Sequence, residues 1–221
     1  MSNSKLVTYT NITDNKNSPR NHVIDTITIH CIVGQWTAKK GCDYFATTSR
    51  QVSSNYVVGK DGSIGLSVDE KDRSWCSSNA ENDHRAITIE VASDDTHPYA
   101  VTTEAYNALI DLVTDICKRN GIKKLVWSTN KADRVNHKNG CNMTVHRDYA
   151  AKACPGEYLY NRHGEIAALV NQRLDADGAE TPSERLYRVQ VGAFKSKANA
   201  DAFLKKVKAA GFSEAFVTVS E

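Results

Sequence analysis

Segments with the period of a strand and segments with the period of a helix follow one another between residues 23 and 174. Alternation of apolar and polar residues predicts the strands, and an Asp-Gly turn at residues 60–62 joins two of them into a hairpin. The predicted strands are, in chain order, 23–33, the two arms of the hairpin over 53–68, 85–93 and 124–127.

Helical signals lie between and after these strands. Residues 102–121 begin at a candidate threonine cap, carry apolar residues at helical spacing and end with basic residues and a glycine. Residues 161–174 predict a closing helix. Strands and helices that intermingle in this way predict an α/β domain over residues 1–174, with a mixed central β-sheet flanked by helices.

A second, smaller part follows this domain. Residues 175–185 are polar, lack periodicity and contain Gly178 and Pro182, which predicts a linker. Residues 186–221 predict a small βαβ annex, with a strand at 186–194, a helix at 197–211 and a strand at 214–220. Because such a unit is smaller than domains that usually fold alone, we expect it to need a partner surface.

The composition excludes several classes of partner. Of 221 residues, 40% are hydrophobic and 24% are charged, which is ordinary for a globular protein. The net charge of +2 and the lack of a basic run interleaved with aromatic residues argue against a nucleic-acid partner. No apolar stretch fits a signal peptide or a membrane span, so we expect the chain to be made in the cytoplasm without either.

The segment TVHRDYAAKACPGEY, residues 144–158, holds a histidine, a lysine and a cysteine close together. Zinc binds histidine nitrogen and cysteine thiolate, and a catalytic zinc site keeps one of its tetrahedral positions open. His146 and Cys154 therefore offer two ligands, and His30, on the polar face of the first strong strand, is the best candidate for the third. A half-buried histidine that only makes hydrogen bonds is the alternative for His30. The six cysteines, in a chain without an export signal, favour buried thiols and a metal ligand over a disulfide framework.

Two further residues have a pattern typical of catalysis. Glu90 is an acidic residue in the middle of a predicted strand, where glutamate is depleted. A half-buried carboxylate with raised proton affinity suits a general base, and a solvent-facing or edge position is the alternative. Lys152, two residues before Cys154, would place an ammonium near the metal to stabilise an oxyanion, although alone it reads as a surface lysine.

Residues in loops are candidates for contact with a substrate, because loops at strand ends carry specificity. These loop candidates are His84, Trp75 and His137, and for the loop histidines a structural role remains open. Asn55, in the first arm of the predicted hairpin, is a further candidate for contact with a substrate. His97, in a polar turn, and His163, in the closing helix, are predicted to be structural, with His163 at the surface.

Four motifs, TITIHC, SNYVVGKDGSI, AITIEVAS and HRDYAAKACPG, occur in this order over roughly residues 23–172. They resemble the zinc-dependent N-acetylmuramoyl-L-alanine amidases of type 2, relatives of phage lysozyme-amidases and peptidoglycan recognition proteins. The resemblance implies one zinc ion bound by His30, His146 and Cys154, with Glu90 and Lys152 as catalytic residues and bacterial peptidoglycan as the partner. Recognition proteins of this group that lack activity have lost the cysteine, so the intact Cys154 favours catalysis.

One position departs from the pattern of the family. Several members have a catalytic tyrosine two residues before the aromatic residue of the hairpin strand, where this chain has Ser54. Tyr56 shares a face with that position because residues two apart in a strand point the same way. It matches the core aromatic residue of the family, however, so packing is its favoured role and Glu90 is the predicted base.

The segment YRVQVGAFKSKANADAFLKKVKAAGF, in the annex, resembles the first half of a SPOR domain, a module that binds glycan strands without stem peptides. A full module has two βαβ halves in one sheet. Two alternatives follow: two chains pair their halves in a homodimer through the C-terminal segment, or the annex is a truncated, poorly ordered piece.

The predicted function is that of an endolysin-like or autolysin-like peptidoglycan hydrolase that cleaves the amide between N-acetylmuramic acid and L-alanine with the help of zinc. Two alternatives stay open: an enzyme that uses Cys154 as a nucleophile, and a wall-binding module without chemistry. A hydrolase made without a signal peptide is expected to reach the wall after release, by phage lysis or lysis of a mother cell.

Overall fold

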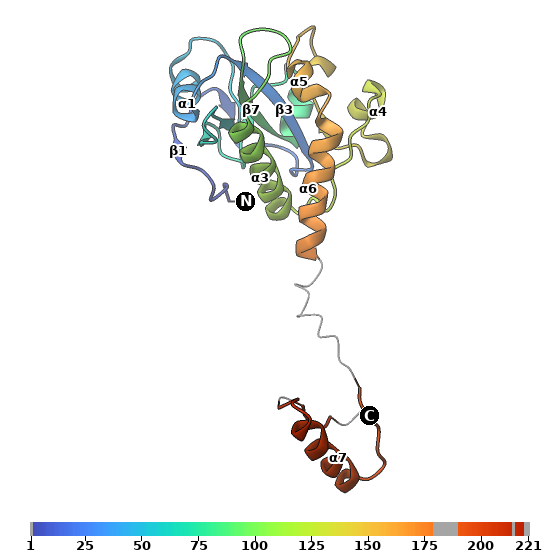
Figure 1. Cartoon of the computed structure of the whole chain (residues 1–221). Coiled ribbons are helices and arrows are strands. Elements are labelled where there is room, and N and C mark those ends of the chain that lie inside the picture. The colour runs from blue at the N-terminus through green and yellow to red at the C-terminus, as the bar shows by residue number, and fades with distance from the viewer. Residues whose placement is uncertain (1, 179–189, 214, 219–221) are drawn as a thin grey trace. The chain divides into compact units, whose positions relative to one another are not determined.

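The computed structural model of the chain describes residues 2–178, 190–213 and 215–218. The chain divides into two compact units, Met1–Ala179 and Glu180–Glu221. The first unit is an α/β structure around a mixed sheet with helices on its faces, which confirms the predicted fold class (Figure 1).

The central sheet has six strands. Their order across the sheet is β1 (Tyr9–Thr10), β5 (Ile64–Leu66), β4 (Tyr56–Val58), β7 (Ala86–Ser93), β3 (Thr26–Val33) and β8 (Met143–Thr144). Only the hairpin β4–β5 is antiparallel, and the other neighbours run parallel. A separate antiparallel pair joins β2 (Lys16–Asn17) to β6 (Arg73–Ser74).

Six α-helices and two short 3-10 helices connect these strands within residues 2–178. They are α1 (Ala38–Thr47), α2 (Ala80–Arg85), α3 (Thr103–Asn120), α4 (Lys131–Val135), α5 (Gly156–Tyr160), α6 (His163–Gly178), η1 (Lys138–Gly140) and η2 (His146–Asp148). The predicted start and stop of α3 are both present. The Thr102 hydroxyl accepts the N–H of Ala105 at 3.1 Å, and Gly121 ends the helix in the left-handed conformation that glycine favours.

The main hydrophobic core lies between the sheet and the packed pair α3 and α6, which Figure 1 shows side by side. One face of the central strands supplies fully buried isoleucines to this core, at positions 27, 29, 87 and 89. Because side chains alternate along a strand, the residues between them point to the opposite face. On that face α1 packs Cys42 and Phe45 against Val57 of β4, and the polar residues of β3 and β7 lie beside them.

The strand predicted at residues 124–127 is wrong, because this segment has no regular secondary structure. Side-chain amides take the place of a neighbouring strand. Asn171 bonds the N–H of Leu125 at 2.7 Å and its carbonyl at 2.9 Å, and Asn142 accepts the N–H of Val126 at 2.8 Å. The short apolar run is therefore apolar because it is buried. Periodicity alone does not distinguish a buried irregular segment from a buried strand.

The closing helix differs from the prediction at both ends. The helix predicted at 161–174 is α6, which begins at His163 and continues to Gly178, and α5 is a separate short helix before it. Residues 175–178 of the predicted linker are therefore helical, and residues 179–185 lie outside the described part of the chain.

The second unit contains α7 (Lys197–Ala209), which confirms the helix predicted at 197–211. No strand is present over the described parts of the two predicted strands, 190–194 and 215–218, and the remaining residues of those strands lie outside the described ones. The backbone groups of a strand need a neighbour to bond, and within this unit none is described. Large apolar side chains are exposed around α7, namely Val191, Phe194, Phe212, Phe216 and Val217.

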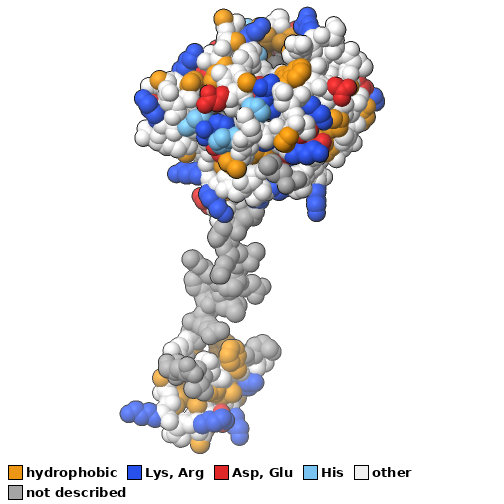
Figure 2. Space-filling model, turned by 180° about the vertical axis from the view of Figure 1, so that it is seen from behind, with side chains coloured by type: hydrophobic (Ala, Val, Ile, Leu, Met, Phe, Trp, Pro, Cys, Tyr) orange, Lys and Arg blue, Asp and Glu red, His pale blue; other side chains and the backbone are white. Residues whose placement is uncertain are grey.

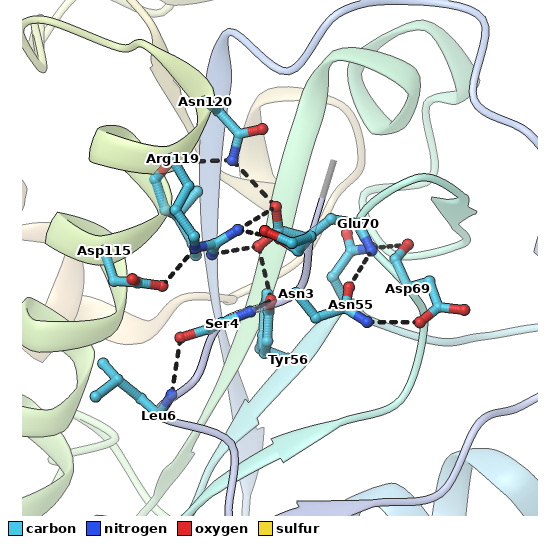
Figure 3. Close-up of polar contacts among 12 residues, drawn as sticks. Asn3, Ser4, Leu6, Asn55, Tyr56, Asp69, Glu70, Asp115, Arg119 and Asn120 are labelled. Atoms are coloured by element: carbon cyan, nitrogen blue, oxygen red, sulfur yellow. Dashed lines mark hydrogen bonds and ion pairs between the residues drawn. The ribbon is translucent and has the colours of Figure 1, made fainter.

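A buried polar cluster joins the first residues of the chain to the sheet and to α3 (Figure 3). The carboxylate of Glu70 is fully buried and accepts hydrogen bonds from the Arg119 guanidinium at 2.6 and 2.9 Å and from the Tyr56 hydroxyl at 2.6 Å. The Tyr56 oxygen also accepts the backbone N–H of Ser4 at 2.9 Å. Tyr56 is thus a packing residue, as the sequence predicts.

Among the described residues, no helix combines the length and the apolar character needed to cross a bilayer.

Candidate metal centre

The register of β3 and β7 brings two predicted site residues together. His30 lies directly opposite Glu90 in this parallel pair, on the face turned away from the α3 and α6 core. The imidazole of His30 is fully buried, and its Nδ1 lies 3.9 Å from Oε1 of Glu90, whose side chain is 15% exposed. The two strands therefore carry an imidazole and a carboxyl group side by side into one half-buried site.

His146 reaches the same site from the neighbouring strand. β8 pairs with β3, and η2 begins at His146, with one residue between it and the end of β8. A buried ion pair holds this turn: Asp148 bonds the Arg134 guanidinium at 2.5 and 2.9 Å and accepts the backbone N–H of Val145 at 3.1 Å. As a result, the rings of His30 and His146 lie edge to face with their centroids 5.0 Å apart.

Cys154 approaches from the loop before α5. Its Sγ lies 3.4 Å from Nδ1 of His30 and accepts the backbone N–H of Cys31 at 3.4 Å. Gly156, with a φ of +78°, allows this loop to pack closely, because a Cβ there would lie 2.7 Å from the Cβ of Tyr99.

These three residues fit a zinc ion. One ligand atom from each of His30, His146 and Cys154 lies within 4.8 Å of the others. Sulfur and nitrogen ligands of a tetrahedral zinc are about 3.5 Å apart, close to the 3.4 Å between Cys154 and His30. Burial lowers the pKa of both histidines, which keeps their imidazoles neutral, and burial raises the pKa of the Cys154 thiol. Two neutral imidazoles and a thiol that loses its proton on binding are a zinc donor set.

Glu90 has the raised proton affinity that the sequence analysis associates with a general base. Burial, reinforced by the nearby Cys31 sulfur, raises the pKa of its carboxyl group to about 8. The thiol of Cys76 donates to Oε1 of Glu90 at 3.7 Å. Cys76 and Glu90 also form, with His30, a second group whose ligand atoms lie within 4.8 Å of one another.

Lys152 is exposed two residues before Cys154, and its positive charge contributes, after burial, to the lowered pKa of His146. It lines a cavity of about 320 Å³ together with Tyr99, Arg147 and Glu157. Figure 2, which views the molecule from behind, shows histidine side chains among lysine and arginine side chains on the face of the first unit turned away from α3 and α6.

The predicted substrate contacts lie in different surroundings. Asn55 is fully buried and bonds backbone groups of Val68 and Thr88, so it is a structural residue out of reach of a substrate. His84 accepts the N–H of Asn21 at 3.1 Å, at the end of α2. Trp75 directly precedes Cys76, and its indole N–H donates to Asn17 at 2.6 Å.

Two of the remaining histidines and Ser54 have structural roles. The prediction that His163 lies at the surface is wrong: it is fully buried, its ring lies 4.4 Å from that of Trp127, and its Nδ1 lies 2.8 Å from the Leu159 carbonyl oxygen. Nδ1 of His137 lies 3.0 Å from the carbonyl oxygen of Cys141. The buried Ser54 hydroxyl donates to the carbonyl of Tyr56 at 2.7 Å.

Sequence reasoning expected the loop from Trp75 to His84 to border the cleft but singled out none of several residues in it that surround the site. They are Cys76, Ser78, Asn82 and Asp83, which lie in and before α2. This helix has only six residues, too few for a hydrophobic period. Its sequence signals are the capping residue Asn79, which accepts the N–H of Asn82 at 2.8 Å, acidic residues in the first turn and basic residues in the last turn.

Comparisons with known proteins agree with the fold and with the motifs. The family described as N-acetylmuramoyl-L-alanine amidase matches residues 20–157, and the SPOR domain matches residues 168–219. No curated protein matches the chain.

Solved structures show the same fold. The chain is similar to PlyL, with a TM-score of 0.56 and 16% identity over 73% of this chain and 95% of that chain. It is also similar to AmpD, studied as a selenomethionine derivative, with a TM-score of 0.56 and 18% identity over 76% of this chain and 99% of that chain. A mutant endolysin from Bacillus subtilis has a TM-score of 0.54 and 15% identity over 74% of this chain and 99% of that chain.

The amidase match covers more than half of the chain and includes His30, Glu90, His146, Lys152 and Cys154. The predicted resemblance is thereby confirmed, both for the first unit and for the SPOR segment. The chain belongs to the family of N-acetylmuramoyl-L-alanine amidases, whose substrate is peptidoglycan.

Proposed function

We propose that the first unit hydrolyses the amide between the lactyl group of N-acetylmuramic acid and L-alanine with a zinc ion held by His30, His146 and Cys154. The observation that carries this proposal is the convergence of two imidazoles and a thiol, from three separate segments, within 4.8 Å. A bound zinc ion supplies Lewis acidity, which polarises the amide carbonyl and acidifies water.

Glu90 is the proposed general base and acid. It takes a proton from the attacking water and returns it to the leaving amine of L-alanine. With a pKa of about 8, protonated Glu90 can return the proton to the leaving amine. The positive charge of a metal ion bound by His30 and Cys154 would lower this pKa and so favour the ionised carboxylate, which accepts the proton from water.

Lys152 is the proposed oxyanion partner. Its ammonium group is exposed at the cavity beside Cys154, so it can approach the carbonyl oxygen as negative charge develops there. Trp75, next to Cys76 at the edge of the site, is the aromatic residue that we propose contacts the substrate.

The contacts of Cys154 argue against a cysteine nucleophile. A nucleophilic cysteine needs a lowered pKa, usually from an imidazolium partner. Here burial raises the pKa of Cys154, and the imidazole at 3.4 Å belongs to His30, whose own pKa burial lowers well below its ordinary value. Without a metal, Cys154 is therefore a protonated thiol and His30 a neutral imidazole. A thiol without an imidazolium partner is a poor nucleophile, whereas both groups can become metal ligands.

Mass spectrometry of fragments released from purified peptidoglycan tests the proposal. We expect stem peptides with free L-alanine amino ends, lost with a chelator and restored by zinc. Release that a chelator does not change would support the cysteine enzyme, and binding without release would support a wall-binding module.

For the SPOR segment we propose binding to glycan strands, which would keep the enzyme at its substrate as in an endolysin that acts on the cell wall. The exposed apolar side chains around α7, such as Phe212 and Phe216, support pairing of two such segments in a homodimer. Sedimentation of the full chain tests the pairing: a monomer at all concentrations would exclude it.

A further inference from the structure

One short segment between β6 and α2 contacts both the proposed base and a proposed metal ligand. The thiol of Cys76 lies 3.7 Å from Oε1 of Glu90, and the hydroxyl of Ser78 lies 3.1 Å from Nε2 of His146. Glu90 belongs to β7 and His146 to η2, so residues two apart in this segment reach two different parts of the site.

The backbone of this segment is held by a buried carboxylate. Asp83 of α2 is 2% exposed and accepts the N–H of Cys76 at 3.0 Å and the N–H of Ser77 at 3.1 Å. Ser78 has a φ of +63°, a left-handed conformation that is uncommon for a residue with a side chain. Such a conformation persists only where the surroundings impose it, and the bonds to Asp83 hold the two residues directly before Ser78, whose hydroxyl meets His146.

The same helix also contacts β3, which carries His30, and β8, which shortly precedes His146. The Asn82 side chain donates to the Thr28 hydroxyl at 3.1 Å and accepts from the Thr144 hydroxyl at 2.9 Å. Thr28 lies two residues before His30 on the same face of β3, and Thr144, the last residue of β8, lies two residues before His146, which begins η2. Movement of this helix would therefore move both histidines together.

We infer that residues 76–83 form a positioning element for the amidase centre, in which Ser78 orients His146 and Cys76 orients Glu90. The inference rests on the proposed function. When Nε2 of His146 carries the proton and donates it to the Ser78 hydroxyl, the lone pair of Nδ1 is free for a metal. Partners of this kind fix the tautomer and the ring orientation of a metal-binding histidine, and their loss typically costs about 10–100-fold in metal affinity or activity.

The test uses the full chain and two readouts, zinc affinity by competition with a chromogenic chelator and the separate values of kcat and KM. We expect Ser78→Ala to bind zinc about 10-fold more weakly or worse. For Cys76→Val we expect unchanged zinc affinity and KM with kcat lowered about 10-fold, and for Cys76→Ser, which keeps a donor, partial recovery of kcat. Ser49→Ala, an exposed serine outside the segment, is the matched control and should behave as the wild type on both readouts.

The outcomes separate this inference from the proposed function. Wild-type zinc affinity in Ser78→Ala together with wild-type kcat in Cys76→Val would overturn the positioning role and leave the zinc amidase standing. A wild-type protein that binds no zinc would overturn both. If a variant loses structure, its circular dichroism spectrum changes, and Asp83→Asn then takes its place: we expect it to lower zinc affinity and kcat together.

Discussion

At the scale of single residues, the surroundings of Glu90 determine its chemistry. Its carboxyl group faces a buried imidazole and a thiol, and burial raises its pKa to about 8. Replacement by glutamine keeps the shape and the hydrogen bond to Cys76 but removes the group that moves the proton. We expect Glu90→Gln to bind zinc and to lose turnover by about 100-fold or more, measured as release of stem peptides from peptidoglycan.

Glu104→Gln, in the first turn of α3, is the matched control because it removes a carboxylate that lies outside the site. Turnover of Glu90→Gln equal to that of this control would remove Glu90 from the mechanism and would leave Lys152 as the remaining proposed catalytic residue.

Cys154 supplies a second prediction at this scale, because it is the proposed ligand that must lose a proton to bind zinc. Burial raises the pKa of its thiol, whereas burial lowers the pKa of His30 and His146 and keeps them neutral. Cys154→Asp replaces the thiol by a carboxylate that is ionised near neutral pH. We expect the wild type to release about one proton more per bound zinc than this variant, measured by calorimetry in buffers of different ionisation enthalpy.

Equal proton release by the two proteins would show that Cys154 is not the ligand. The same calorimetry gives the zinc stoichiometry, for which we expect one ion per chain, and a second bound ion would point to the group formed by Cys76, Glu90 and His30.

At the scale of secondary-structure elements, a buried ion pair holds the turn that presents His146. The side chains of Arg134 and Asp148 are 2% and 0% exposed, and Asp148 also accepts the N–H of Val145. Removal of one partner leaves a buried charge without compensation, which costs about 3–5 kcal/mol. We therefore expect Asp148→Asn to lower the free energy of unfolding by this amount in urea titrations, and to lower zinc affinity because the turn loosens.

The pair Arg173 and Asp111 offers the matched control. Its side chains are 44% and 55% exposed, and such surface pairs contribute about 0–1 kcal/mol. The free energy of unfolding of Asp111→Asn should be close to that of the wild type. Equal losses of this free energy in Asp111→Asn and Asp148→Asn would show that burial does not set the contribution of an ion pair here.

Elements were predictable from the sequence where a local signal and the tertiary structure agree. Helix α3 has a threonine cap, an apolar stripe and a terminal glycine, and all three are in the structure. The segment 124–127 has only its apolar residues, and two distant asparagines replace the strand neighbour that the pattern suggested. Helix α2 is too short for a hydrophobic period, so its position over the site depends on Asn82, whose partners Thr28 and Thr144 are far away in the sequence.

The residues of the site were likewise predictable only where the sequence carries a local signal. His30 and Glu90 were predictable because each is a polar residue within an apolar strand, and parallel pairing places them opposite each other. Asn55 was not, because its amide bonds buried backbone groups that no spacing reveals. His163 was misplaced for a related reason: its neighbour Arg162 suggested a surface, while the contact that buries it comes from Trp127, far away in the sequence.

At the scale of the whole molecule, the buried His163 couples stability to pH. Burial lowers the pKa of its imidazole from 6.5 to about 4. Between these two values the unfolded chain binds a proton that the folded protein does not, so the contribution of His163 to stability is complete above pH 6.5 and is lost as the pH falls toward 4. The fully buried His30, with a lowered pKa, acts in the same direction.

Comparison with a variant isolates this residue from the others that titrate. His163→Phe keeps a ring beside Trp127 and removes the titration, so we expect the wild type to lose about 2 kcal/mol more than the variant between pH 7.5 and pH 5. Urea unfolding followed by tryptophan fluorescence, in a buffer with chelator, measures this difference, because all three tryptophans lie in the first unit. His22→Gln, at the surface, should follow the wild type. If the stability curves of wild type and His163→Phe run parallel through this range, His163 takes up a proton without unfolding, and the acid sensitivity of the fold belongs to His30 and the metal centre.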